Sequence, residues 1–291
     1  KIVYYLPMKN LLALLLLSFI TLADDKGHES LMATLYVQES AEYKAHIRTT
    51  FKTAEATIPF LLKQKEISAS IDQMNGEKNF FDKPPAIILD VDETVFNNSA
   101  YQARLIVNNT NYPDGWIEWV KEEKATFLPG ALSYMKTAKE LGVEIFFVTN
   151  RLHELEPATR NNLVKEGFDL SDDIDQILTR YEKPSWDRNK TSRIALIAED
   201  YRIIQIIGDN LGDFIDGQQN KKSSNFRKSI VEQTDSFWGF VWFMIANPTY
   251  GDWEGSVINF DYEQSENDQI KQKLNALDLS LIHISEPTRP Y

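Results

Sequence analysis

Short runs of apolar residues alternate with helix-like segments along most of the chain. Four apolar runs predict buried strands, at residues 86–89, 143–148, 203–207 and 240–245. Helices are predicted before the second and third runs, because ALSYMKTAKEL and TSRIALIAEDY repeat apolar residues at three- and four-residue spacing. Strands that are almost continuously apolar and alternate with helices are typical of a parallel sheet covered on both faces. The pattern therefore predicts an α/β fold.

Two segments lie outside this alternation. Residues 30–65 have helical spacing without glycine and with one proline, which predicts an N-terminal helical extension within residues 24–85. Residues 97–128 are rich in asparagine and aromatic residues, and they follow the first strand directly. Ligands of open α/β sheets bind at the carboxyl ends of the strands. We therefore expect residues 97–128 to form a small cap over the carboxyl end of the sheet.

The two ends of the sequence carry their own signals. Met8-Lys9-Asn10 opens the apolar run LLALLLLSFI, and Ala23 stands before acidic residues, which is the pattern of a secretory signal peptide. A membrane anchor is the alternative, although the run is shorter than the ~20 residues that a spanning helix needs. We expect residues 1–23 to be upstream residues and signal peptide, with cleavage near Ala23 and a periplasmic or secreted protein.

Residues 266–291 are expected to form a C-terminal tail. Its last part, LSLIHISEPTRPY, resembles translated adapter or vector sequence, and a natural tail is the alternative. We assign this segment no function.

Charge and composition narrow the possible functions. The 291 residues contain no cysteine, which excludes disulfides, thiolate catalysis and cysteine-ligated zinc. The formal net charge of −12 opposes binding to nucleic acid polymers. A small phosphorylated substrate remains compatible with this charge if local cations and a metal ion offset it.

Polar residues follow the predicted strands at the same edge of the sheet. Asp90 and Asp92 come after the first strand, and Thr149 and Asn150 after the second. Asp209 and Asp213 come after the third strand, and Lys190 opens the helix before it. Because the carboxyl ends of parallel strands share one edge, these side chains should converge. Clustered carboxylates repel one another unless a cation lies between them, and oxygen ligands suit a hard ion such as Mg²⁺.

Three stretches of the chain form recognisable motifs: DVDETVFNNSAY, GDNLGDF and ANPTYGDWEG. They resemble motifs of the class C acid phosphatases of the haloacid dehalogenase (HAD) superfamily, the 5′-nucleotidase and lipoprotein e-like group, and the resemblance covers about residues 30–263. It implies a Rossmann-like HAD core over residues 86–265, with a parallel sheet flanked by helices, a small cap at about 97–128 and the N-terminal helical extension. A lipid anchor is not expected, because the chain has no cysteine to carry it.

The resemblance also implies a role for each aspartate. Asp90 matches the nucleophile that forms an aspartyl-phosphate. Asp92 matches the general acid that protonates the leaving alcohol and then, as a base, activates water. Asp209 joins Asp90 and the backbone carbonyl of Asp92 in holding Mg²⁺. Asp213 stands behind these metal ligands and orients a metal-bound water.

Phosphate contacts are implied for three further residues. The Thr149 hydroxyl and the Asn150 backbone N–H match groups that bind phosphoryl oxygens. Lys190 matches the lysine that neutralises both the phosphate and the crowded carboxylates. Lys183 lies upstream in the same loop and is the alternative. We prefer Lys190, because it opens a helix and the spacing to Arg193 follows the family pattern.

The predicted function is that of an exported, Mg²⁺-dependent acid phosphatase. Its expected substrates are small phosphomonoesters, including nucleoside 5′-monophosphates whose base stacks on Tyr101, Trp116 and Tyr250. The family further suggests a homodimer. The alternative is a catalytically silent storage or binding relative, as plant vegetative storage proteins are similar to acid phosphatases. That alternative is disfavoured because the four acidic positions, including the nucleophile, are all present.

Overall fold

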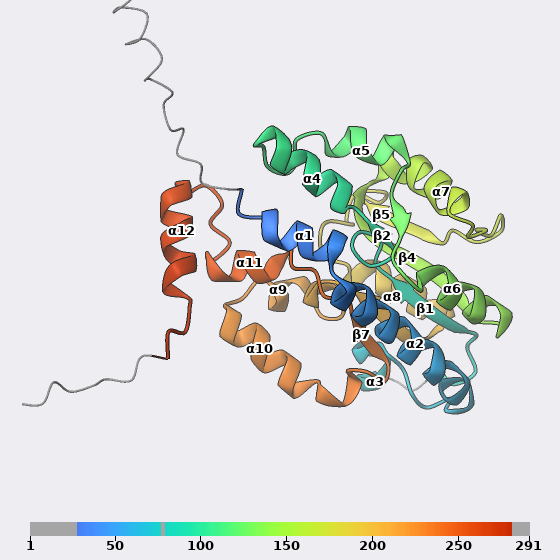
Figure 1. Ribbon diagram of the computed structural model, residues 1–291. Coiled ribbons are helices and arrows are strands. Elements are labelled where there is room, and N and C mark those ends of the chain that lie inside the picture. Colours follow the sequence, from blue (N-terminus) through green and yellow to red (C-terminus); the bar gives the residue numbers. More distant parts are fainter. Residues whose placement is uncertain (1–27, 77–78, 281–291) are drawn as a thin grey trace, which may run out of the picture.

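A five-stranded parallel sheet forms the centre of the protein (Figure 1). The computed structural model describes residues 28–76 and 79–280, and the strand order is β5-β4-β1-β6-β7. The strands are β1 Pro85–Leu89, β4 Glu144–Leu152, β5 Ile177–Arg180, β6 Arg202–Gly208 and β7 Trp242–Met244. Every residue of β6 is buried, as expected for a strand covered on both faces. The predicted α/β fold is confirmed.

The strand predictions are accurate in the middle of the sheet and weaker at its edges. The first three predicted strands correspond to β1, β4 and β6, although β4 extends four residues beyond the apolar run. The fourth is shorter than predicted, because only Trp242–Met244 pairs with β6. The edge strand β5 was not predicted, since its sequence ILTR offers too short an apolar run.

Helices cover both faces of the sheet. The longer ones are α1 Leu31–Glu39, α2 Ala41–Lys63, α4 Ser99–Asn108, α5 Trp116–Glu122, α6 Ala131–Glu140, α7 Glu156–Lys165, α8 Thr191–Asp200, α10 Ser224–Gln233 and α12 Glu266–Asn275. The short ones are α3 Ile71–Asn75, α9 Gly217–Asn220 and α11 Asp252–Val257. The connections β1–α6–β4 and β5–α8–β6 run in opposite directions along the sheet, so right-handed crossovers place α6 and α8 on opposite faces (Figure 1).

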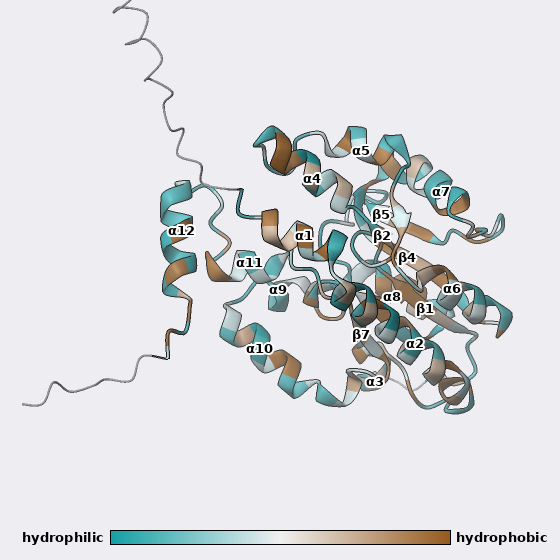
Figure 2. Cartoon of the chain, viewed as in Figure 1, coloured by the Kyte–Doolittle hydropathy of each residue, from teal (hydrophilic) through white to brown (hydrophobic). Residues whose placement is uncertain are grey.

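Residues 30–65 of the N-terminal extension form two helices, α1 and α2, not the single helical stretch that the spacing predicted. Ser40 has an extended backbone between α1 and α2, and its side-chain oxygen accepts a hydrogen bond from the Tyr43 N–H at 2.9 Å. This cap ends one helix and begins the next. The buried face of α2 packs onto β6 and β7. In Figure 2 the central strands are largely brown, whereas the surrounding helices mix brown with teal.

Gln205 interrupts the apolar pattern of β6 because it serves a buried polar network. Its side chain is fully buried, and its amide nitrogen donates to the Ala54 carbonyl at 2.8 Å and to Thr57 Oγ1 at 2.7 Å. The Tyr134 hydroxyl donates to Gln205 Oε1 at 2.5 Å. The network ties the neighbouring helices α2 and α6 to β6, since each hydrogen bond of the Gln205 side chain is to a residue of one of these helices.

The segment predicted as a cap holds two helices and a short ribbon. β2 Phe96–Asn97 pairs antiparallel with β3 Thr126–Phe127, and α4 and α5 lie between them in the sequence. The rings of Phe96 and Phe127 stack with centroids 5.4 Å apart. Figure 1 shows α4 and α5 outside the sheet layer, at the top of the view.

The two ends of the chain fall largely outside the described residues. The predicted signal segment at residues 8–23 and residues 281–291 lie there entirely. The predicted C-terminal tail starts with a helix, α12, capped by the Ser265 side chain, which accepts from the Asp268 N–H at 3.2 Å. Among the helices of the described residues, none has both the length and the apolar character needed to cross a membrane.

Candidate active site

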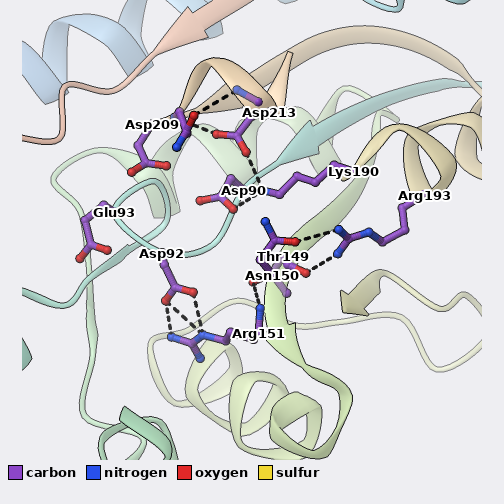
Figure 3. A network of polar contacts seen from close by, with 12 residues as sticks. Asp90, Asp92, Glu93, Thr149, Asn150, Arg151, Lys190, Arg193, Asp209 and Asp213 are labelled. Atoms are coloured by element: carbon purple, nitrogen blue, oxygen red, sulfur yellow. Dashed lines mark hydrogen bonds and ion pairs between the residues drawn. The ribbon is translucent and has the colours of Figure 1, made fainter. Parts of the chain in front are cut away.

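The turn after β1 separates the first two aspartates. The Asp90 N–H donates to the Ile207 carbonyl of β6 at 3.0 Å, which fixes the end of the strand. Val95 and Phe96 N–H groups then donate to the Val91 carbonyl at 3.0 and 2.8 Å and close a tight turn. Within this turn Glu93 has a φ of 60°, a strained conformation for a residue with a side chain. Figure 3 shows the result: the Asp90 side chain lies beside Lys190, whereas the Asp92 side chain is directed toward Arg151.

Three carboxylates from two strand ends gather at one point. Asp90, Asp209 and Asp213 each offer an oxygen within 4.8 Å of the others. Asp213 is held in place by the Asn210 N–H, which donates to its Oδ2 at 2.9 Å. Gly208 is required beside it, because a Cβ there would lie 2.3 Å from Asp213 Oδ2. The GDNLGDF motif therefore folds so that two of its aspartates face Asp90.

Lys190 supplies the cation of this cluster. Its Nζ donates to Asp213 Oδ1 at 2.7 Å and also to Asp90 Oδ1, and the residue is only 4% exposed. Lys183, the alternative considered from the sequence, lies on the surface with its Nζ over the Trp186 ring. The structure thus brings Lys190 to the carboxylates and leaves Lys183 outside.

The electrostatics of the cluster show an excess of negative charge. Burial raises the pKa of Asp90 to about 7, an effect that Lys190 opposes and that the charges of Asp213 and Asp92 reinforce. Burial, together with the charges of Asp90 and Asp213, raises the pKa of Asp209 well above its usual range. The buried carboxylates of Asp90 and Asp213, the half-buried carboxylate of Asp209 and a single ammonium group form an oxygen-rich site that fits a hard divalent cation.

The phosphate-binding candidates lie at the end of β4. Thr149 is fully buried, and its Oγ1 accepts from the Arg151 N–H at 3.1 Å. Arg193, one turn after Lys190 on α8, donates from Nη2 to Asn150 Oδ1 at 2.9 Å and from Nη1 to the Thr149 carbonyl. The Asn150 side chain is therefore engaged by Arg193, and its backbone N–H remains the group predicted to bind phosphate.

Asp92 has partners that the sequence did not assign. Arg151 donates from Nη2 to Asp92 Oδ1 at 2.7 Å, and Asn98 donates from Nδ2 to the same oxygen at 2.9 Å. A further unassigned contact joins Asn247 Nδ2 to Asp209 Oδ2 at 2.8 Å. The sequence places Arg151 directly after Thr149-Asn150 and Asn247 within ANPTYGDWEG. These positions suggested that both residues lie near the site, but they did not show which side chains the two residues contact.

The aromatic candidates occupy different environments. Tyr101 is 2% exposed, its hydroxyl donates to the Asp114 carbonyl at 2.9 Å, and its ring packs edge-on against Trp116. It therefore fills the interior of the cap. Trp116 is half-buried. The Tyr250 hydroxyl donates a hydrogen bond to Glu93, and burial raises the pKa of that glutamate to about 8. Base stacking by these rings stays a prediction.

Comparison with known proteins identifies the family. Residues 28–253 match the family model of the HAD superfamily, subfamily IIIB (acid phosphatase). The chain belongs to this acid phosphatase subfamily. The resemblance to class C acid phosphatases inferred from the three motifs is thereby confirmed, and the site above lies within the matched residues.

Solved structures of a class C acid phosphatase agree with the subfamily IIIB assignment. The class C acid phosphatase from Bacillus anthracis superposes with a TM-score of 0.74 at 29% identity, covering 86% of this chain and 96% of the other. Its tungstate-bound structure gives the same values. The stem 28 kDa and stem 31 kDa glycoproteins of Glycine max are each 28% identical over 143 residues, 46% of this chain. The match spans about half the length of these two relatives, 54% and 47%.

Proposed function

We propose that the protein is a metal-dependent phosphomonoesterase that works through an aspartyl-phosphate. The observation that carries the proposal is the position of Asp90, which is buried at the end of β1 between Lys190 and the carboxylates of Asp209 and Asp213. A rigid carboxylate beside a buried cation suits attack on a phosphoryl group, because the site supplies positive charge where the dianion binds. Membership of the acid phosphatase subfamily supports the same chemistry.

The reaction divides into two displacements. An oxygen of Asp90 attacks phosphorus, the ester P–O bond breaks, and Asp92 gives its proton to the leaving alkoxide. A water then attacks the phosphorus of the aspartyl-phosphate and gives a proton to Asp92, while the P–O bond to Asp90 breaks and releases inorganic phosphate. Asp92 must be protonated at the start, which favours turnover at acidic to neutral pH.

The residues of the acidic cluster fit Mg²⁺ as the metal. Asp90, Asp209 and the backbone carbonyl of Asp92 would hold the ion, with Asp213 behind them, and all of these donors are oxygens. The ion would neutralise negative charge on the phosphoryl oxygens and on the clustered carboxylates. The Thr149 hydroxyl, the Asn150 N–H and Lys190 would bind the remaining phosphoryl oxygens.

Hydrolysis of p-nitrophenyl phosphate with and without a chelator tests the proposed reaction. We expect turnover that EDTA abolishes and that added Mg²⁺ restores, because the acidic cluster repels the substrate dianion when no metal ion balances it. The metal-free protein should stay folded, as judged by circular dichroism, since its sheet does not depend on the ion. Absence of metal-dependent turnover at every acidic and neutral pH would overturn the proposal and favour a binding-only relative.

We infer that nucleoside 5′-monophosphates are among the substrates. The cap places the half-buried Trp116 over Arg151, and the segment after β7 places Tyr250 against Glu93, so aromatic rings lie close to the partners and neighbours of Asp92. Aromatic faces bind nucleobases by stacking, worth ~1–3 kcal/mol per base. The same assay, run with nucleoside, sugar and aryl phosphates, measures this preference as kcat/KM.

We further propose that the protein is exported. The support is the basic, apolar and small-residue pattern over residues 8–23. N-terminal sequencing of protein recovered outside the cytoplasm should give a start near Asp24, and an uncleaved, membrane-bound chain would contradict the proposal.

A further inference from the structure

Arg151 is a buried cation whose guanidinium group is hydrogen-bonded to two side chains, those of Asp92 and Thr159. Its side chain is 1% exposed, and Nε and Nη2 both donate to the carboxylate of Asp92, at 3.1 and 2.7 Å. The remaining nitrogen, Nη1, donates to Thr159 Oγ1 at 3.0 Å. Thr159 is fully buried and in turn donates to the Leu155 carbonyl at 2.9 Å. The guanidinium group is thus anchored to the protein core through α7.

Two aromatic rings of the cap enclose the same guanidinium group. Its central carbon lies 5.3 Å from the Phe96 ring centroid and 5.7 Å from that of Trp116. Phe96 is itself fully buried and stacked on Phe127. Since a planar guanidinium stacks on aromatic faces and is held there with little freedom, Arg151 has one well-defined position between core and cap.

Asp92 receives its third donor from the base of the cap. Asn98 is fully buried, donates from Nδ2 to Asp92 Oδ1 and accepts from Trp119 Nε1 at 2.8 Å. Its N–H donates to Glu93 Oε1 at 2.9 Å. Within the part of the chain that the structure describes, every hydrogen bond of the Asp92 carboxylate therefore comes from Arg151 or Asn98, and Figure 3 shows it directed toward Arg151 and away from Asp90.

We propose that Arg151 is a positioning residue that sets the location of the Asp92 carboxylate during phosphoryl transfer. The inference rests on the function proposed above, in which Asp92 moves the proton of the leaving group. Paired hydrogen bonds from a guanidinium fix both the distance and the plane of a carboxylate. Arg151 acts through Asp92 and does not itself bind substrate, so its loss should matter most when the leaving oxygen needs a proton.

Two substrates with different leaving groups distinguish a role in positioning the proton donor from a role that affects every substrate equally. Phenyl phosphate releases an oxygen that needs protonation, whereas 2,4-dinitrophenyl phosphate releases a stable anion. For Arg151→Met we expect kcat/KM for phenyl phosphate to fall by about 10–10²-fold, a part of the 10²–10⁴-fold that general acid catalysis supplies. For the dinitrophenyl ester we expect kcat/KM to fall by less than about 3-fold, because kcat/KM covers only the steps up to release of the leaving group, and this leaving group needs no proton.

A double-mutant cycle tests whether Arg151 acts through Asp92. In the Asp92→Asn background, Arg151→Met should change kcat/KM for phenyl phosphate by less than about 2-fold, because the acid that it positions is already gone. The conservative Arg151→Lys should lose less activity than Arg151→Met, since one charged donor remains. If Arg151→Met does not fold, Arg151→Lys carries the same leaving-group comparison.

Arg104 provides a matched control on the outer side of the cap. It makes a two-point ion pair with Glu122, at 2.6 and 2.8 Å, and lies over the Trp119 ring at 4.9 Å, but its side chain is 46% exposed. Arg104→Met should leave both esters unaffected. Equal losses on the two esters in a folded Arg151 variant, or additive losses in the cycle, would overturn the inference. Inactivity of the wild-type protein on both esters would instead overturn the proposed function.

Discussion

Replacing Asp90 by asparagine is expected to abolish phosphatase turnover while the protein stays folded. An amide oxygen cannot form the acyl phosphate through which the reaction is proposed to run, so kcat should fall by about 10⁵-fold or more, as for loss of a nucleophile in other enzymes. The substitution keeps the size of the side chain, and Lys190 keeps its ion pair with Asp213. Steady-state hydrolysis of p-nitrophenyl phosphate and far-ultraviolet circular dichroism measure the two outcomes.

Asp216→Asn is the matched control for that substitution. Asp216 is an aspartate near the same sheet edge, and its side chain caps α9 by accepting from the Gln218 N–H at 2.8 Å. Asparagine caps helices about as well as aspartate, so activity should be retained. Full activity of Asp90→Asn would show that a different residue is the nucleophile.

Replacing Lys190 by methionine is expected to lower both activity and stability. Removing one partner of a buried ion pair typically costs about 3–5 kcal/mol, because the remaining charge stays buried without compensation. Here two carboxylates lose their cation, Asp90 at 7% and Asp213 at 5% exposure. Loss of a group that stabilises the phosphoryl transition state should lower kcat by about 10²–10³-fold. Urea unfolding and phosphate release measure the two effects.

The loss of folding stability caused by Lys190→Met should depend on pH and on the presence of a divalent metal ion. The folded-state pKa of Asp90 is raised to about 7, so its contribution to stability is present below the unfolded carboxyl range and is lost as pH rises through about 7. The variant should therefore be less destabilised near pH 5 than near pH 8. A divalent cation should restore stability by mass action, because it binds the folded cluster. The exposed Lys183→Met is the control, and equal destabilisation by both variants would contradict the central position of Lys190.

The sequence predicted the elements whose burial is complete and uniform. The runs that became β1, β4 and β6 are almost wholly apolar, because both faces of the sheet are covered there. The edge strand β5 escaped prediction because ILTR is short and half polar. The break between α1 and α2 at Ser40 was not predicted either. A serine within a helical pattern can lie in a helix or cap one, and only the backbone conformation tells the two apart.

Residue types and their order along the chain determined the chemistry of this protein. Asp90, Asp92, Asp209 and Asp213 follow strand ends, and parallel strands bring their carboxyl ends to one edge whatever the details of packing. The sequence alone therefore indicated an oxygen-rich cation site, and the resemblance of its motifs to class C acid phosphatases implied phosphoryl transfer there.

Only the tertiary structure decided which side chains form hydrogen bonds and ion pairs with these aspartates. Lys190 and Asp90 are 100 positions apart, and Arg151 and Asp92 are 59 apart. Such pairs depend on strand order, on register and on the direction of each side chain, none of which a local pattern contains. The fold selected Lys190 over Lys183, turned Tyr101 into the cap interior and directed Arg151 at Asp92, because packing fixes side-chain direction only after the helices and strands have been assembled.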